Sequence, residues 1–226
     1  TAHRAQSYET DRCFLIFDHA LILHADTLHT GPGPRNSMSK SRIRQLDTDA
    51  LDDDQRRVYD TIVASRGNAH GPFRIWLHSP EMADLAQQLG EYVRYRSRLE
   101  PRFSELAILV TSRAWDCQTE WSLHEPHAIE AGLAPELVEA VRLSQYPEFE
   151  REDEQSIYDF AAELVYNRFV QERTFANAVD IIGDAGVVDL TGLVGYYSMV
   201  AMTLNAFQVP LPEGTKPLLV DCPTFR

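Results

Sequence analysis

The chain has 226 residues, of which 44% are hydrophobic and 24% are charged, and its formal net charge at pH 7 is −13. This content is enough for one substantial core. The negative charge argues against nucleic acid or an anionic membrane as the main partner, because both require a basic surface. No uninterrupted apolar run approaches the roughly 20 residues that are needed to cross a bilayer.

Three cysteines are present, Cys13, Cys117 and Cys222, and no two of them form a CxxC pair. An odd number of cysteines without such a pair indicates neither a disulfide framework nor a structural zinc site. We therefore expect reduced thiols and a cytoplasmic protein.

Residues 1–37 differ in character from the rest of the chain. The apolar run 13–17 has neither the positive lead nor the small-residue cleavage site of a signal peptide. The breaker-rich segment 31–37 (GPGPRNS) then precedes Met38. We predict that residues 1–37 are an N-terminal extension that is poorly packed or does not belong to the natural protein, whose start would then be Met38.

The pattern becomes helical from about residue 47. An acidic lead precedes a first helix at 55–64. Ser79, Pro80 and Glu81 then form a strong helix start, with a cap, a first-turn proline and a charge that complements the helix dipole. The helix that they open runs to about residue 96 and carries one apolar stripe, made of Met82, Leu85, Leu89, Tyr92 and Val93.

In the next predicted helix, 102–115, apolar residues leave almost no polar face, so we expect this helix to be central and buried. Asp116 is the predicted N-cap of a helix that runs through His124, and Pro126 inside that helix should kink it. Four more helices are predicted, at 135–143, 153–167, 174–185 and 187–207.

No segment shows the alternation of a β-strand. The chain is therefore predicted to be all-α, with a single helical domain at residues 38–209. The proline-rich tail, residues 210–226, is predicted to be extended.

Glu105 lies on the most apolar of the predicted helices. A carboxylate there must be paired, hydrogen-bonded or neutralised, because burying a lone charge is costly. It is either a functional group or the structural partner of an arginine such as Arg94, Arg96 or Arg113, and the sequence alone leaves both interpretations open.

The segment 117–124 (CQTEWSLH) contains a second set of candidate groups. Glu120 and His124 are four residues apart and share one helix face. A carboxylate that is hydrogen-bonded to one ring nitrogen fixes the tautomer of a histidine and raises its basicity, which gives an acid/base pair. Cys117 lies near the first helical turn, where the helix dipole favours a thiolate. The alternative is an ordinary surface ion pair beside a buried thiol.

Glu120, His124 and His127 could together supply three ligands to a metal ion. They are not accompanied by HExxH or by another tight ligand signature. No metal and no other cofactor is therefore predicted.

Three stretches of the sequence resemble carboxymuconolactone decarboxylase-like proteins: 71–80 (GPFRIWLHSP), 99–109 (LEPRFSELAIL), and Glu120-Trp121 with His124. The resemblance extends through 195–197 (GYY) to Asn205 and implies the all-α fold that this family shares with the alkyl hydroperoxidase D group. The motif of that group is E…CxxCxxxH. Glu105, Cys117 and His124 match it, and Glu120 stands where the second cysteine would be.

That difference separates two chemistries. In the peroxidase branch, the resemblance implies that the second cysteine attacks the peroxide and the first resolves the sulfenic acid. Glu120 cannot form a disulfide, so a dithiol cycle is not available. We therefore expect a cofactor-independent decarboxylase or lyase that acts on a small carboxylated or lactone substrate. His124 would be the acid/base, Glu120 its orienting partner and Glu105 a supporting carboxylate.

Other residues are candidates for the substrate pocket. His78 lies beside a helix start, and Arg74 or Arg102 could hold a substrate carboxylate through two hydrogen bonds, although Arg102 could equally be structural. The remaining predicted pocket residues are Cys117, Trp121, His127 and Tyr196. For the aromatic residues, including Trp76, Trp115 and Tyr197, core packing is the alternative.

Two other functions stay open. One is a thiol peroxidase that uses Cys117, and the other is a non-catalytic, oligomeric binding protein. The resemblance implies a homo-oligomer, either a trimer or a hexamer. A small molecule is the expected ligand, and neither a nucleic acid nor a membrane is expected as a partner.

Overall fold

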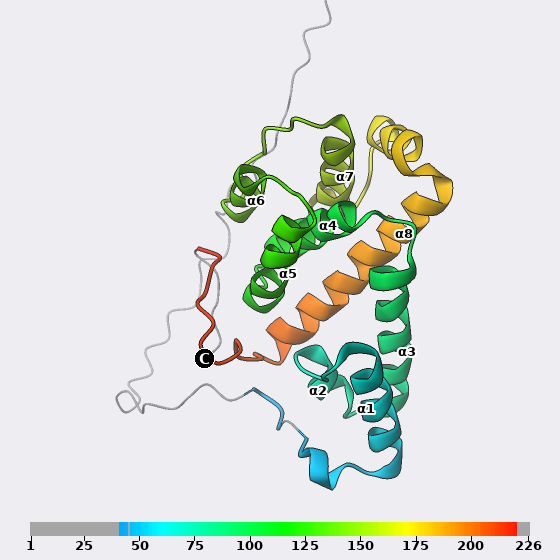
Figure 1. Ribbon diagram of the computed structural model, residues 1–226, viewed down its shortest axis with the longest axis vertical. Coiled ribbons are helices and arrows are strands. Elements are labelled where there is room, and N and C mark those ends of the chain that lie inside the picture. Colours follow the sequence, from blue (N-terminus) through cyan, green and yellow to red (C-terminus); the bar gives the residue numbers. More distant parts are fainter. Residues whose placement is uncertain (1–40, 45, 221–226) are drawn as a thin grey trace, which may run out of the picture. The chain divides into compact units, whose positions relative to one another are not determined.

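Helix α4 (Pro101–Ala114) is the centre of the fold in the computed structural model, which describes residues 41–44 and 46–220 (Figure 1). Its residues are buried without interruption from Phe103 to Ser112. A helix that is buried on every side must be surrounded by other elements. Helices α5, α6, α7 and α8 all pack against it. The prediction of a central, buried helix is confirmed.

The described residues contain eight α-helices and no strand, which confirms the predicted all-α class. The other helices are α1 (Asp53–Arg66), α2 (Pro72–Trp76), α3 (Pro80–Glu91), α5 (Gln118–Glu130), α6 (Pro135–Arg142), α7 (Glu152–Ala162) and α8 (Glu172–Ala206). The π-helical segments η2 (Tyr92–Arg96) and η3 (Glu163–Asn167) continue α3 and α7, and a 3-10 turn, η1 (Thr48–Ala50), precedes α1. The predicted extension, residues 1–37, lies outside the described residues, and its nature stays a prediction.

The helix starts follow local sequence signals, with two corrections. Helices α2, α3, α4 and α6 each have a proline in the first turn, where its missing N–H is not needed. Ser79 occupies the N-cap position of α3, but its side chain makes no capping hydrogen bond. The N-cap of α5 is Cys117 and not Asp116, whose backbone φ of 49° turns the chain before the helix. Pro126 lies inside α5, which continues to Glu130.

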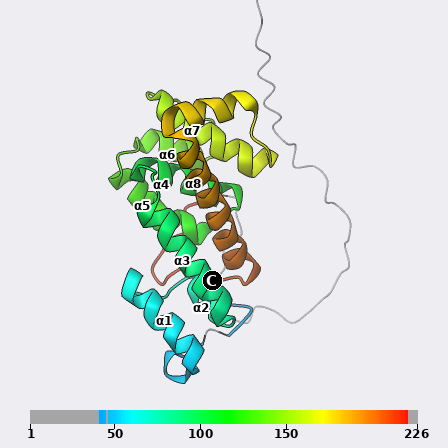
Figure 2. The ribbon, with the colours of Figure 1, turned by 90° about the vertical axis from the view of Figure 1, so that its right-hand side faces the viewer.

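Helix α8 consists of two helical parts that meet at Gly183, where φ is 69° and ψ is 170°. Such a positive φ favours glycine. The break at Gly183 lies slightly earlier than the predicted break at residue 186. The second part runs beside α3 and across α4 (Figures 1 and 2). By length and composition alone α8 could span a membrane, but 61% of its most apolar window is buried in the protein. We interpret α8 as a core helix.

The predicted apolar stripe of α3 exists, but most of it faces outward. Leu85, Leu89 and Tyr92 are exposed, whereas Val93 is buried. The buried face of α3 is made instead of small residues and one amide: Ala83, Ala86, Gln87 and Gly90. Small side chains allow neighbouring helices to approach α3 closely.

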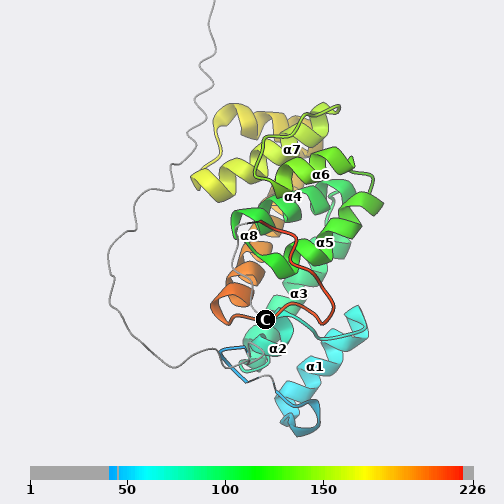
Figure 3. The same ribbon diagram turned by 90° about the vertical axis from the view of Figure 1, so that its left-hand side faces the viewer.

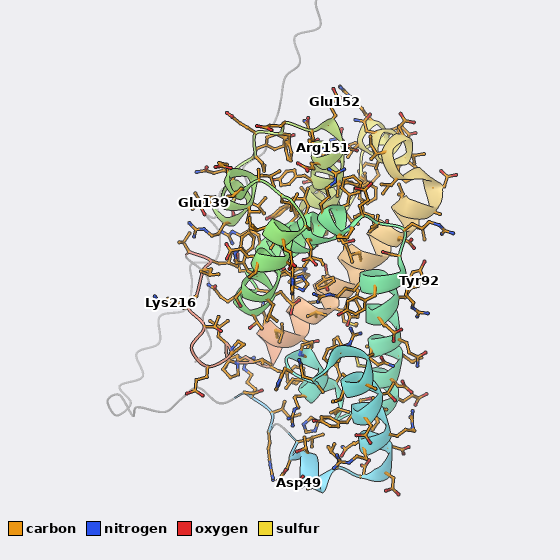
Figure 4. All side chains as sticks on the ribbon, viewed as in Figure 1. Asp49, Tyr92, Glu139, Arg151, Glu152 and Lys216 are labelled. Carbon is orange, nitrogen blue, oxygen red and sulfur yellow. The ribbon has the colours of Figure 1, made fainter. Side chains whose placement is uncertain are left out.

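A charged cluster ties α4 to α7 at the end of the molecule where α7 begins, near Arg151 and Glu152 (Figures 3 and 4). Arg102 Nη2 lies 2.6 Å from Asp153 Oδ2, and its Nη1 lies 3.0 Å from Glu154 Oε1. The same guanidinium stacks over the Phe103 ring. Arg102 therefore has a structural role, which answers the alternative that the sequence left open.

The cluster makes a prediction about stability. Hydrogen bonds from Arg102 and Arg151 hold the pKa of Asp153 well below its usual value. A depressed pKa of this kind stabilises the fold above the unfolded-state pKa, and the contribution is lost as the pH falls. We expect Asp153→Asn to lower the free energy of unfolding by about 1.5–3 kcal/mol at pH 7 in urea denaturation. The difference from the wild type should shrink below the ordinary pKa of 3.8.

Asp84→Asn is the matched control. Asp84 pairs with Arg57, whose side chain is 58% exposed, and such surface pairs contribute about 1 kcal/mol or less. Equal losses of stability in the two variants would contradict the structural role of the Arg102 cluster.

Candidate active site

The candidate site is organised by a buried contact between α4 and α5. His124 Nδ1 lies 2.7 Å from Glu105 Oε2, and both residues are buried. With Glu105 ionised, Nδ1 carries the hydrogen and donates it, which leaves Nε2 free for chemistry on the other side of the ring. The partner of Glu105 is thus a histidine, and none of the arginines that the sequence suggested forms an ion pair with it among the described residues.

Two more groups approach Nε2 of His124. Glu120 Oε2 lies 3.6 Å away, from the preceding turn of the same helix. Arg94 Nη1, in the π-helical segment η2, lies 3.5 Å away. The predicted i,i+4 arrangement of Glu120 and His124 therefore brings the two side chains together, and a third group joins them from a separate element.

Glu120 is buried, and burial raises the pKa of its carboxyl group. The neighbouring His124 and Arg94 act in the opposite direction, and Glu105 adds to the increase. Two carboxylates and only one guanidinium share this volume, so one further proton on the Glu120–His124 pair balances the charge. Glu120 and His124 lie close enough for the pair to hold that proton.

Cys117 begins α5 and is only 1% exposed. Burial and, to a smaller extent, the charge of Glu120 raise the pKa of its thiol to about 12. Hydrogen bonds from the backbone at Glu120 and Thr119 lower the pKa but do not compensate. The expectation that the helix dipole would favour a thiolate is therefore wrong, because desolvation is the stronger effect here.

Tyr197 of α8 contacts His124, and the adjacent Tyr196 packs behind it. The Tyr197 ring meets the His124 ring edge-on, with the centroids 5.0 Å apart, and Tyr196 packs between Tyr197 and Trp76. Burial raises the pKa of both tyrosines, so both hydroxyls are protonated at neutral pH. Tyr197, which the sequence identified only as a possible wall residue, is thus the tyrosine that contacts His124. Tyr196 lies one ring further away, and its assignment to the substrate pocket stays a prediction.

Two of the predicted pocket residues lie elsewhere. His78 is exposed, and its Nε2 lies 2.8 Å from the backbone oxygen of Arg44. Arg74 donates a 2.9 Å hydrogen bond to the backbone oxygen of Leu46 and stacks over Tyr59. These side chains fasten the segment before η1 to α2. The geometry therefore does not support either residue as a binder of substrate.

His127 and Trp121 lie at the edge of the site. The ring of His127 is near that of His124, with a centroid separation of 6.1 Å, but its side chain is 51% exposed and faces Glu130. Trp121 is fully buried beside Glu120. Within the part of the chain that the structure describes, no three His, Cys, Asp or Glu side chains are arranged to hold a metal ion.

Arg94 is the site residue that the sequence analysis missed, since it was named only as one possible ion-pair partner of Glu105. It belongs to η2, where the helix widens into π geometry. Such a turn shifts the side chains that follow it relative to a regular helix, and it is frequent at functional sites. Helical periodicity therefore gave no signal that Arg94 points toward His124.

Comparison with known proteins confirms the resemblance. Residues 80–148 match the sequence model of the carboxymuconolactone decarboxylase family. This segment contains Glu105, Cys117, Glu120 and His124. A search of curated protein sequences gives no match.

Several solved structures share the fold. An uncharacterized peroxidase-related protein from Silicibacter sp. TM1040 is 14% identical, with a TM-score of 0.64, and the alignment covers 86% of this chain and 100% of that one. An uncharacterized peroxidase-related protein from Ralstonia eutropha JMP134, with an alkylhydroperoxidase AhpD core, is 16% identical, with a TM-score of 0.64. The alignment covers 76% of this chain and 93% of that one. The debrominase Bmp8 is 13% identical, with a TM-score of 0.60 and coverages of 74% and 90%. At these identities the similarity establishes the fold alone, an alkyl hydroperoxidase D-like helical fold.

The burial of Cys117 predicts how its thiol reacts. In a Cys13→Ser/Cys222→Ser protein, only Cys117 remains to react with a disulfide reagent such as Ellman's reagent. We expect no fast thiol release from the folded protein at pH 8, because the reagent cannot reach the sulfur and the thiolate fraction is very small. The same protein in guanidinium chloride, which exposes the thiol, is the control. Rapid, complete reaction of the folded protein would contradict the structure at this position.

Proposed function

We propose that the chain is a cofactor-independent decarboxylase or lyase for a small carboxylated or lactone substrate, because residues 80–148 match the model of the carboxymuconolactone decarboxylase family. This match supports an enzymatic role in general. The observation that carries the proposal is His124, a histidine only 2% exposed, bound by Glu105 at Nδ1 and facing Glu120 at Nε2. This arrangement is suited to acid/base catalysis and needs no cofactor.

In the proposed reaction, Glu105 fixes the imidazole tautomer and Nε2 of His124 exchanges a proton with the substrate. Glu120 is the second member of the proton-holding pair. Its raised pKa allows it to keep a proton in reserve or to accept one without leaving a bare charge in the protein interior.

Loss of CO₂ breaks a carbon–carbon bond and leaves an electron pair on the substrate. In a substrate with a conjugated carbonyl group, this pair moves to the carbonyl oxygen and gives an enolate. The protonated hydroxyl of Tyr197, beside His124, is available to donate a hydrogen bond to that oxygen. His124 then delivers its proton to carbon, and the reaction is balanced without an oxidant or a reductant.

Thiol chemistry is less compatible with this site. A peroxidase of the dithiol type needs a second cysteine, and Glu120 occupies that position of the motif. A single reactive thiolate is also disfavoured, because Cys117 is buried and its pKa is raised to about 12. These observations support acid/base catalysis over thiol peroxidase activity as the proposed function.

We also propose that the protein is a homo-oligomer that associates through the outward faces of α3 and α8. Leu85 and Leu89 on α3, and Val188 and Met202 on α8, are large apolar residues that lie exposed. A hollow of about 410 Å³ is lined by Ser79 and Glu81 at the start of α3, by apolar residues of α3 and by Met199 of α8. Exposed apolar patches of this kind commonly mark interfaces. The cytoplasmic location stays a prediction.

The catalytic proposal is tested by CO₂ release from a panel of carboxylated lactones and β-keto acids. We expect His124→Ala to reduce the rate by about 10²–10⁴-fold, as is usual when an acid/base group is removed, and Glu120→Gln to reduce it strongly. Cys117→Ser should retain activity, which makes it the matched control within the same segment. Full activity of His124→Ala protein, with circular dichroism like that of the wild type, would contradict acid/base catalysis by His124.

The interface is tested by light scattering after size-exclusion chromatography. We expect the double variant Leu85→Lys/Leu89→Lys to dissociate into smaller species, because two charges would be placed in an apolar contact. Leu123→Lys, at an exposed leucine of α5, is the control and should leave the mass unchanged. A wild-type protein that is monomeric at every concentration would rule out the oligomer.

A further inference from the structure

Arg94 is a partly buried cation beside His124. Its guanidinium lies 3.5 Å from His124 Nε2 and stacks over the Tyr95 ring, 5.5 Å from its centroid. It forms no salt bridge with any carboxylate in the described part of the chain. Burial alone would lower its pKa, but Tyr197, Tyr95 and the two site carboxylates raise it overall, so the group stays charged. A guanidinium has five N–H donors, and in this site most of them have no protein acceptor.

The segment that presents Arg94 is held at both ends by one buried carboxylate. Tyr92 donates a 2.8 Å hydrogen bond to Asp189 Oδ1, and the backbone N–H of Arg98 donates a 3.0 Å hydrogen bond to Asp189 Oδ2. Tyr92 is the first residue of η2, at the end of α3 (Figure 4), and Arg98 follows η2 by two residues. Asp189 therefore fixes the chain on both sides of Arg94.

Two glycine contacts add to this clamp. Gly90 of α3 lies so close to the Tyr196 hydroxyl that a Cβ atom there would overlap it. A Cβ atom on Gly192 of α8 would lie 3.8 Å from Val93 Cγ1. Asp189, Gly192 and Tyr196 follow one another along α8, and their contacts lie in the reverse order along α3 and η2. The two segments are therefore antiparallel, and these contacts fix their register. Arg94, one residue after Val93, is thereby placed over His124.

We propose that Arg94 binds the carboxylate of the substrate and that Asp189 is the positioning residue that holds Arg94 in place for it. The identity of the ligand rests on the proposed function, whereas the position of Arg94 does not. The planar fork of a guanidinium matches a carboxylate through two parallel hydrogen bonds. Tyr197, whose ring meets that of His124, carries a further hydroxyl donor.

The charges of the site favour a monoanionic group over a dianion such as phosphate. Glu105 and Glu120 already contribute two carboxylates to the same volume. Arg94 and one proton on the Glu120–His124 pair already balance these two charges. One more negative charge can be balanced by a second proton on the pair, which leaves Glu120 neutral and His124 positive, but two more cannot. The ligand class is therefore a carboxylate, and not a phosphate ester.

The test measures binding without turnover. Acetate and benzoate are titrated into the protein by calorimetry, with acetamide and benzamide as neutral probes of the same shape. We expect the wild type to bind the carboxylates and not the amides. Arg94→Ala should weaken carboxylate binding by about tenfold or more, and Arg94→Lys, which keeps the charge but loses the fork, should give an intermediate affinity. Arg96→Ala, at an exposed arginine of the same segment, should bind like the wild type.

The role of Asp189 is read from the ¹⁵N signals of the His124 ring at fixed pH. Arg94→Ala should shift the Nε2 signal, because the neighbouring donor is lost. Asp189→Asn should shift it in the same direction and weaken carboxylate binding, while Asp184→Asn, at an exposed position of the same helix, should do neither. Should Asp189→Asn fail to fold, Tyr92→Phe removes one of the two clamping hydrogen bonds and should give a smaller shift in the same direction.

Equal binding of carboxylates and amides, no carboxylate binding, or unchanged binding in Arg94→Ala would overturn the proposal for Arg94. A wild-type His124 signal in folded Asp189→Asn and Tyr92→Phe proteins would overturn that for Asp189. The proposed catalysis can fail separately, since full activity of His124→Ala would remove it even if Arg94 binds carboxylates. Conversely, activity that depends on His124 but is unchanged in Arg94→Ala would overturn only the proposal that Arg94 binds the substrate carboxylate.

Discussion

The hydrogen bond between Glu105 and His124 is the interaction on which the centre of the molecule depends. Helix α4 is surrounded on all sides, so its carboxylate loses its hydration when the chain folds. A buried charge of this kind is tolerated only where a partner replaces the lost water. The 2.7 Å contact with His124 provides that partner and joins α4 to α5, the helix that also carries Glu120.

The same requirement explains why groups from other elements converge on this histidine. Glu120 brings a second carboxylate into the interior, and Glu105 raises the cost of ionising it. Arg94 from η2 supplies the positive charge that limits this cost. Removing the charge of Glu120 or of Arg94 would therefore change the cost of burying the remaining charged groups, because these groups compensate one another. The charges that we propose for catalysis are therefore the same ones whose balance allows them to be buried in the fold.

How much of this the sequence predicts depends on the range of the signal. First-turn prolines and the acidic lead of α1 are local, and they located the helix starts to within a few residues. The i,i+4 spacing of Glu120 and His124 is also local, and it predicted their shared face. The partner of Glu105 is nineteen positions away in another helix, and no local rule selects it. The π turn that carries Arg94 changes the helical register, so periodicity misplaces that residue.

Residues chosen by their chemistry rather than by a spacing rule were the least predictable. Arg74 and His78 have suitable side chains, but they bind the backbone oxygens of Leu46 and Arg44, respectively. The apolar stripe of α3 was identified correctly as a stripe, yet the face that packs inward is the one with small residues. Close packing on α8 favours small side chains over large ones, and a hydrophobic pattern does not contain that information.

Glu120 stands where the motif that this segment resembles has a second cysteine, and its carboxylate affects both of its neighbours. Burial and, in addition, the charge of Glu120 raise the pKa of Cys117, which disfavours a reactive thiolate. Glu120 also adds a negative charge next to His124, which a proton on the pair or the guanidinium of Arg94 must balance. Glu120 therefore disfavours a thiolate at Cys117 and pairs with His124 at once. With Asp189 holding the chain on both sides of Arg94, we propose that the same balance of charges provides a place for an anionic substrate.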